Sequence, residues 1–226
     1  MGSFSRSMYD ILLEANKNRG NFAYSHCIYG KHETPFHISR FDHIVDADNI
    51  KDVKGNVYYF GHYQAPTSDI RKWSEKTSHP FEAGEWIVAH NGVINNVEEV
   101  VSIFSLPQKI LVDTSVIPFA LDKLSADNTK SLLSLDILVK TVLENLKGTF
   151  SLWIIHKKSK RAFLARQGSI LYVNTVTGSF SSVECKSKDW ITLPEGYIYE
   201  IDLKKGGIVP ANRFETKSPF IFIPEE

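Results

Sequence analysis

The sequence predicts an α+β fold in which two β-sheets pack together and helices cover their outer faces. Two observations favour this fold. The hydrophobic pattern changes from helix to strands, to helices and back to strands, and no low-complexity linker divides the chain. With 226 residues, of which 42% are hydrophobic, the chain is also long enough to bury a substantial core. We therefore expect one domain over residues 1–226.

The first predicted element is a helix that ends near Arg19-Gly20, because apolar residues share one face: Met8, Ile11, Leu12 and Ala15. Four strands should follow, since runs of aromatic and β-branched residues alternate with turn-forming residues. These strands are expected over residues 22–29, 36–38, 57–62 and 86–90. The last is almost continuously apolar, which is typical of a strand covered on both faces.

Three helices are predicted next from apolar residues at helical spacing, over residues 97–104, 116–124 and 135–146. The third should be the longest and should end at Gly148 in a C-cap position. Four more strands are then expected to form a meander with tight turns, over residues 150–155, 161–166, 170–173 and 197–201. A helical block between two strand-rich blocks is what predicts the layers.

Composition argues against several classes of protein. The 26 Lys and Arg residues cancel the 26 Asp and Glu residues, so no net positive field favours nucleic acid or an anionic membrane. No run approaches the ~18 apolar residues of a transmembrane helix, and no signal peptide is evident. Two cysteines are too few for a disulfide framework, so a cytoplasmic location is expected. The eight histidines lack metal-site spacing and no Gly-rich phosphate loop occurs, so we expect neither a metal nor another cofactor.

Three segments are candidates for chemistry. His90-Asn91-Gly92 lies between a strand and a helix, where an amide side chain and a backbone N–H could stabilise an oxyanion, although Asn-Gly is also typical of a tight turn. Asp113 precedes a helix and could equally be a helix N-cap. Residues 61–68 leave a strand for a polar loop, where a ligand site and a surface turn would look the same.

The order and spacing of these segments resemble the glutaminase domain of class II glutamine amidotransferases, which are N-terminal nucleophile hydrolases. Gly2-Ser3-Phe4 is similar to the family's opening Cys-Gly-Ile-Phe without its Cys, and residues 89–96 are similar to its His-Asn-Gly segment. Further similar segments are Arg19-Gly20 and residues 61–67, 79–81, 113–117, 148–151 and 166–171. The resemblance covers about residues 1–203, followed by a C-terminal tail over residues 204–226, and implies a four-layer αββα fold.

This resemblance implies hydrolysis of the glutamine side-chain amide to glutamate and ammonia. In the family, the thiol of an N-terminal Cys attacks the amide and its own α-amine acts as the base, which suits an amine with an ordinary pKa of about 8. By the same resemblance, Asn91 and the Gly92 N–H would form the oxyanion hole, Asp113 would bind the substrate ammonium group, and Thr67 and His90 would belong to the substrate-binding segments.

The ammonia released would need an acceptor. Since the chain ends soon after the last family-like strand, we expect the acceptor to be a separate synthase protein. Residues 219–223 are apolar and could dock that partner or pack as a strand on their own domain.

Two positions depart from the family pattern. The family's carboxylate-binding Arg falls at Gln64, and a neutral amide cannot form the bidentate ion pair that Arg forms with a carboxylate. Either Gln64 binds more weakly, or another cation such as Arg71 takes over, or the substrate is not free glutamine. Met1 occupies the position of the nucleophile, and neither Cys27 nor Cys185 carries a free α-amine.

The missing Cys leaves three interpretations. The chain could be an inactive variant whose natural start reads Met-Cys-Gly-Ser-Phe, and we favour this because the segments around Asn91 and Asp113 match the family. It could instead be a natural pseudoenzyme that binds glutamine or an amidated ligand. It could also be a hydrolase of peptides or N-acyl amides on the same fold, an alternative that Gln64 keeps open.

Overall fold

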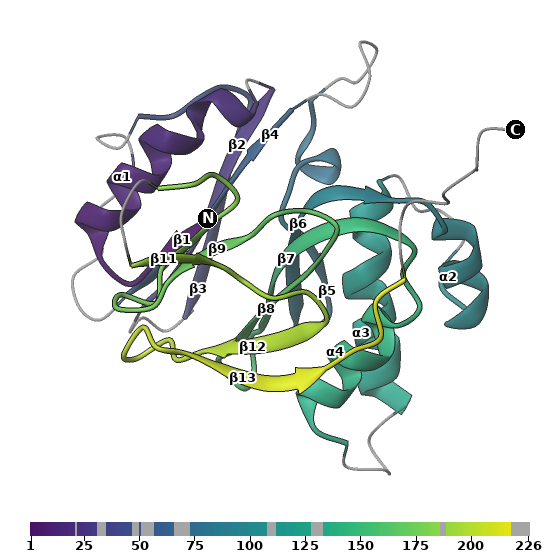
Figure 1. Ribbon diagram of the computed structural model, residues 1–226. Coiled ribbons are helices and arrows are strands. Elements are labelled where there is room, and N and C mark those ends of the chain that lie inside the picture. The colour runs from purple at the N-terminus through teal and green to yellow at the C-terminus, as the bar shows by residue number, and fades with distance from the viewer. Residues whose placement is uncertain are drawn as a thin grey trace, which may run out of the picture.

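The computed structural model describes residues 1–20, 22–30, 35–46, 50, 57–65, 73–107, 112–127, 133–185 and 189–217. Within these residues two antiparallel sheets pack on each other and helices lie on both outer faces (Figure 1). The predicted α+β fold with four layers is therefore confirmed. No helix in the described ranges is long and apolar enough to cross a membrane.

The first sheet has seven strands, and the start of the chain lies inside it. Its strands, in spatial order, are β11 (Trp190–Thr192), β9 (Tyr172–Asn174), β10 (Phe180–Ser181), β1 (Gly2–Ser3), β4 (Tyr58–Gln64), β2 (Ala23–Tyr29) and β3 (Phe36–Phe41). Although β1 has only two residues, Gly2 pairs with Phe60 on one side and with Phe180 on the other. The first residues are thus held between two neighbouring strands.

The second sheet has six strands and carries the segment that resembles the oxyanion motif. In spatial order they are β13 (Ile208–Arg213), β12 (Tyr197–Ile201), β8 (Arg161–Gln167), β7 (Gly148–His156), β6 (Trp86–Ile94) and β5 (Phe81–Ala83). The central pair β6 and β7 runs in register over nine residues, from Trp86 opposite His156 to Ile94 opposite Gly148. This long ladder extends to the end of β6, where the candidate site residues lie.

Helices cover the two sheets from opposite sides. They are α1 (Arg6–Asn16), α2 (Val97–Ile103), α3 (Val116–Asp127) and α4 (Leu135–Leu143), with short 3₁₀ turns η1 (Lys17–Arg19), η3 (Glu75–Thr77) and η4 (Asp113–Ser115). The buried face of α1 packs with residues of the first sheet, and α2 to α4 pack with residues of the second. A third apolar cluster, which includes Phe60, Trp153 and Leu164, fills the space between the sheets.

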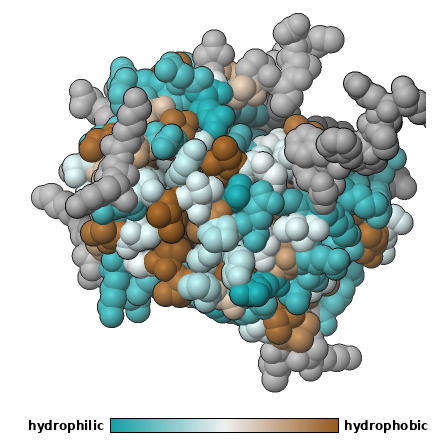
Figure 2. Space-filling model, in the orientation of Figure 1, coloured by the Kyte–Doolittle hydropathy of each residue, from teal (hydrophilic) through white to brown (hydrophobic). Residues whose placement is uncertain are grey.

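The surface shown in Figure 2 is mainly hydrophilic, as expected when the apolar residues lie between the layers. On the face seen in Figure 2, hydrophilic residues predominate and hydrophobic residues gather in a narrow band. The largest fully buried side chains, by contrast, are mostly aromatic and aliphatic, with Trp86 and Tyr9 among them. The core therefore lies in the three interfaces between the four layers.

Two predictions about the helical block were wrong. The longest helix is α3, with 12 residues, whereas α4 has only nine and ends before residues 144–146. Gly148 is not a helix cap, because it is the first residue of β7 and has a φ of +124°. A Cβ at this position would lie 2.1 Å from the Val93 carbonyl oxygen, so the strand pair itself requires glycine.

The predicted meander was also wrong in its connections. After β8 the chain leaves the second sheet and contributes β9, β10 and β11 to the first, and it then returns to form β12. Part of the predicted tail, residues 204–226, forms a strand, because β13 pairs with β12 in the second sheet. Residues 218–226, including the apolar segment 219–223, lie outside the described residues.

Candidate active site

Both sheets line a cavity of about 910 Å³. The residues singled out from the sequence come together here from four separate parts of the chain: Met1, Gln64, His90, Asn91, Gly92 and Asp113 all line the cavity wall. Thr67 and Arg71 lie outside the described residues, so their predicted roles stay predictions. The cavity is large enough to take a small polar metabolite.

Met1 is fixed at this cavity by backbone hydrogen bonds. Its α-amine donates to the Gly61 carbonyl oxygen at 3.1 Å, and its carbonyl oxygen accepts from the Gly61 N–H at 2.8 Å. The Met1 side chain belongs to the apolar cluster beneath α1, together with Tyr9 and Tyr59. The α-amine, rather than the thioether, is therefore the group of Met1 that can react as a base.

The position of this amine changes its acidity. Burial, together with the positive charge of Arg19, lowers the pKa of the Met1 α-amine to about 5. The amine is accordingly neutral at pH 7 and can accept a proton. The thioether has no proton to lose and is not the activated nucleophile that acyl transfer requires.

Asn91 and Gly92 are strand residues, and the tight-turn alternative is excluded. Both lie within β6, where Asn91 is opposite Ser151 and Gly92 is opposite Phe150. Gly92 has a φ of +142°, and a Cβ there would lie 2.1 Å from the Thr149 carbonyl oxygen. No other residue type fits this position without displacing β7. Among the described residues, none forms a hydrogen bond with the Asn91 side-chain amide, which lines the cavity.

Asp113 lies at the start of η4, and its carboxylate is oriented by two backbone donors. Ile94 N–H donates to Oδ2 at 2.9 Å, and Thr114 N–H donates to Oδ1 at 2.8 Å. The first bond links η4 to the end of β6. The N-cap of η4 is Val112, so the alternative that Asp113 is a helix N-cap is wrong. The Asp113 side chain remains 28% exposed, so it can still receive a cationic ligand group.

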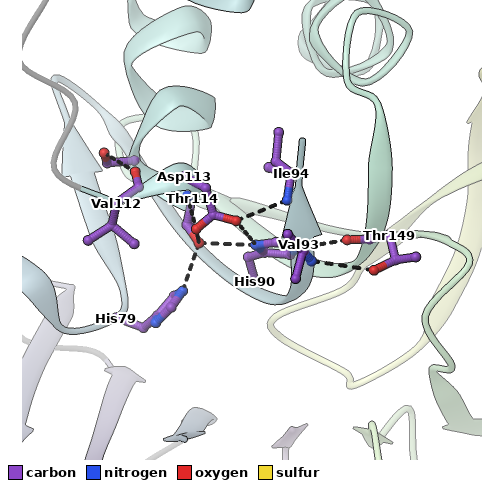
Figure 3. A network of polar contacts seen from close by, with 9 residues as sticks. His79, His90, Val93, Ile94, Val112, Asp113, Thr114 and Thr149 are labelled. Carbon is purple, nitrogen blue, oxygen red and sulfur yellow. Dashed lines mark hydrogen bonds and ion pairs between the residues drawn. The ribbon is translucent and has the colours of Figure 1, made fainter. Parts of the chain in front are cut away.

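A chain of hydrogen bonds behind Asp113 fixes this part of the wall (Figure 3). His90 Nε2 lies 3.1 Å from the Thr149 carbonyl oxygen, which can only accept, so the proton is on Nε2. Burial lowers the pKa of His90, the ring is neutral, and Nδ1 accepts from the Thr114 hydroxyl at 3.0 Å. That hydroxyl must then accept from His79 Nε2, also at 3.0 Å. The Thr149 carbonyl thus determines the tautomer of His90, and the Thr114 hydroxyl passes this constraint on to His79.

Gln64 has a structural partner in the same wall. Its Oε1 accepts from the His79 backbone N–H and its Nε2 donates to the Thr77 carbonyl oxygen, both at 3.3 Å. The amide therefore connects the end of β4 to the segment around η3. This arrangement explains how a neutral side chain is accommodated here, but it supplies no cation for a carboxylate.

Sequence reasoning missed three contributors to the site. Thr114 and Thr149 hold His90 through a hydroxyl and a backbone carbonyl, which a sequence pattern does not mark as functional. Arg19 also lines the cavity, although the sequence assigned it only to the end of the first helix and to a family-like Arg-Gly pair, with no role in the site. The sequence feature that could have identified Thr114 is its position directly after Asp113. For Arg19 that feature is the Arg19-Gly20 pair.

Solved structures identify the fold. The chain is similar to glutamine phosphoribosylpyrophosphate amidotransferase from B. subtilis, with a TM-score of 0.70 and 15% sequence identity over 96% of this chain and 49% of that one. The fold is that of the class II glutamine amidotransferases. A protein from Pseudomonas aeruginosa described as a predicted glutamine amidotransferase has a TM-score of 0.56 and 12% identity, over 83% of this chain and 86% of that chain.

Sequence comparison points to a second group of proteins. No family model matches this chain. It is 33% identical over 126 residues to the 7-cyano-7-deazaguanine synthase of Saccharolobus solfataricus and 29% identical over 126 residues to that of Sulfolobus acidocaldarius. Each match covers 55% of this chain and 26% of the synthase. The chain therefore matches about a quarter of the length of these curated relatives.

The hydrogen-bond chain gives a first testable prediction. Thr114→Val should lower the free energy of unfolding by about 1–3 kcal/mol, because it leaves polar atoms of two buried histidines without their partner. Thr114→Ser keeps the hydroxyl and serves as the matched control. Urea denaturation measures both variants, and equal stability of the two would contradict the role given to the hydroxyl.

A second prediction concerns pH. Burial lowers the pKa of His62 to about 3, helped by the Met1 amine and His90, and the Met1 amine itself has a pKa of about 5. In the unfolded chain these groups titrate at their ordinary pKa values of 6.5 for His62 and 8.0 for the amine. The unfolded chain therefore binds more protons than the folded one from about pH 3 to 6.5 at His62 and from about pH 5 to 8 at the amine. The free energy of unfolding should therefore rise with pH from about 3 to about 8.

Chemical denaturation at several pH values tests this rise. His62→Gln should remove the part of the rise between about pH 3 and 6.5 and leave the contribution of the Met1 amine between about pH 5 and 8. A variant curve parallel to that of the unsubstituted protein over the whole range would show that His62 does not titrate as described.

Proposed function

We propose that this chain is a glutaminase-type domain that binds glutamine in the cavity and hydrolyses its side-chain amide when a Cys occupies the first position. The observation that carries the proposal is the meeting of a neutral α-amine at Met1 with Asn91, Gly92 and Asp113 around one cavity. These are the group types that attack on an amide needs: a base, oxyanion donors and a site for the substrate ammonium group.

Each group has a role in the proposed reaction. The α-amine of residue 1 takes the proton from the attacking thiol, and the thiolate adds to the amide carbon. The Asn91 side chain and the Gly92 N–H stabilise the resulting oxyanion. The amine then returns the proton to the leaving nitrogen, ammonia departs, and water releases glutamate from the thioester. Asp113 binds the substrate ammonium group, and the hydrogen-bond chain through His79, Thr114 and His90 keeps this part of the wall in place.

Met1 contributes to the binding site, but it cannot supply the nucleophile for the reaction. With a thioether at residue 1, the chain retains the base and the oxyanion donors and lacks the nucleophile. Cys27 does not replace it, because that residue is fully buried in β2 and burial raises the pKa of its thiol well above the usual range. Cys185 does not line the cavity either. We therefore expect glutamine binding without turnover.

Two alternatives follow from the same cavity. A pseudoenzyme would bind glutamine or another amidated ligand and would stay inactive after a Cys is introduced. A hydrolase of peptides or N-acyl amides would, with the same Cys, prefer substrates that lack a free carboxylate, and the neutral Gln64 is the feature that favours it. Activity toward glutamine compared with N-acyl amides separates these functions.

The decisive experiment introduces Cys as the first residue after removal of an initiator Met. This variant should release ammonia from glutamine, measured by a coupled glutamate dehydrogenase assay. Adding Asn91→Ala to it should lower kcat by about 10²–10³, because one oxyanion donor is lost. A folded Cys variant that binds glutamine but releases no ammonia would contradict the proposed glutaminase and favour the pseudoenzyme.

We also propose that a separate synthase accepts the ammonia. The partial match to 7-cyano-7-deazaguanine synthases supports a protein of that kind as the partner, because a cyano group contains a nitrogen that ammonia can supply. Co-expression of this chain with the 7-cyano-7-deazaguanine synthase of the same genome should yield a complex in size-exclusion chromatography with light scattering. Elution of two separate monomers at micromolar concentration would contradict this partner.

A further inference from the structure

The proposed substrate poses an electrostatic problem. Glutamine carries an α-ammonium and an α-carboxylate group, and Asp113 offers a charge of the sign that suits only the ammonium. A carboxylate that leaves water needs a cation or several hydrogen-bond donors in return. Gln64 cannot supply a charge, and its amide is already bonded to residues 77–79.

Arg19 is placed to meet this need. Among the described residues that line the cavity, it is the only Lys or Arg. It ends η1, and the next residue, Gly20, packs directly on the end of β4, where a Cβ would lie 2.3 Å from the Gln64 carbonyl carbon and 2.3 Å from the Ala65 nitrogen. Arg19 and Gln64 therefore lie on adjoining backbone segments at the cavity.

The guanidinium group of Arg19 is held at this place and keeps donors for a ligand. Its Nη2 donates to the Ser182 carbonyl oxygen at 2.5 Å, a contact between η1 and the segment after β10, and Ser182 also lines the cavity. A guanidinium has five N–H donors in a planar fork that matches a carboxylate. Within the described ranges Arg19 forms no ion pair, and its charge acts on the Met1 amine.

We propose that Arg19 binds the α-carboxylate of glutamine and so takes the place of the cation that is missing at position 64. This assignment rests on the proposed function. It gives the cavity two charged groups of opposite sign, Arg19 from the helical turn beside the first sheet and Asp113 from η4 beside the second. Together they recognise a zwitterionic amino acid, whereas an amide without a free carboxylate would use only one of them.

Isothermal titration calorimetry on the full chain tests the assignment with two probes, L-glutamine and its α-carboxamide. Arg19→Gln should weaken L-glutamine binding about tenfold or more, as expected for loss of hydrogen bonds to a charged group. Binding of the α-carboxamide should be unchanged by the substitution. Arg19→Lys keeps the charge but not the fork, and its affinity for L-glutamine should be intermediate.

Lys17→Gln is the matched control, because it removes one positive charge from the same turn at a residue that does not line the cavity. Its affinity for L-glutamine should stay within about twofold of the unsubstituted chain. Equal glutamine affinity in the Arg19→Gln and unsubstituted proteins would overturn the assignment of Arg19 alone. Absence of glutamine binding to the unsubstituted protein would contradict the proposed function as well.

Discussion

The pairing of the first residues inside the seven-stranded sheet is the constraint on which the site depends. Met1 exchanges two backbone hydrogen bonds with Gly61, and Gly2 pairs on both sides, so the terminal amine is held in a buried and fixed position. That burial keeps the amine neutral. Without the pairing, a chain end would be mobile and solvated, and its amine would be protonated near neutral pH.

The opposite wall is rigid for a different reason. There the position of Asn91 and Gly92 follows from the β6–β7 ladder and from the close approach of Gly92 to Thr149, while Asp113 is tied to Ile94. These contacts link a strand, a 3₁₀ turn and a neighbouring strand into one unit. The Met1 amine on one sheet and the Asn91 and Gly92 groups on the other can therefore keep a constant separation, which the proposed catalysis by preorganised groups needs.

The sequence predicted the layers well because strands and helices differ in their hydrophobic period. The order and spacing of its motifs also identified Asn91 and Asp113 as candidate site residues. It failed where contacts depend on distant residues. Gly148 was predicted to be a helix C-cap because glycine after a helix often adopts a positive φ. In the structure its positive φ belongs to a strand, and glycine is needed there because a Cβ would collide with the Val93 carbonyl oxygen. The path of β9 could not be predicted, since a short apolar strand does not encode which sheet it joins. Thr114 was missed because a hydroxyl acquires its role from the two histidines that it meets.

The buried amine of Met1 also has a consequence for chain extension. Because the α-amine of Met1 is buried, bonded to Gly61 and placed at the cavity, a peptide attached ahead of Met1 would start next to the space that a ligand needs. An amino-terminal fusion would then act as a tethered competitor, present at high effective concentration and displaced only by unpairing the first strand. The same pairing that fixes the terminal amine at the cavity makes the cavity sensitive to residues attached ahead of Met1.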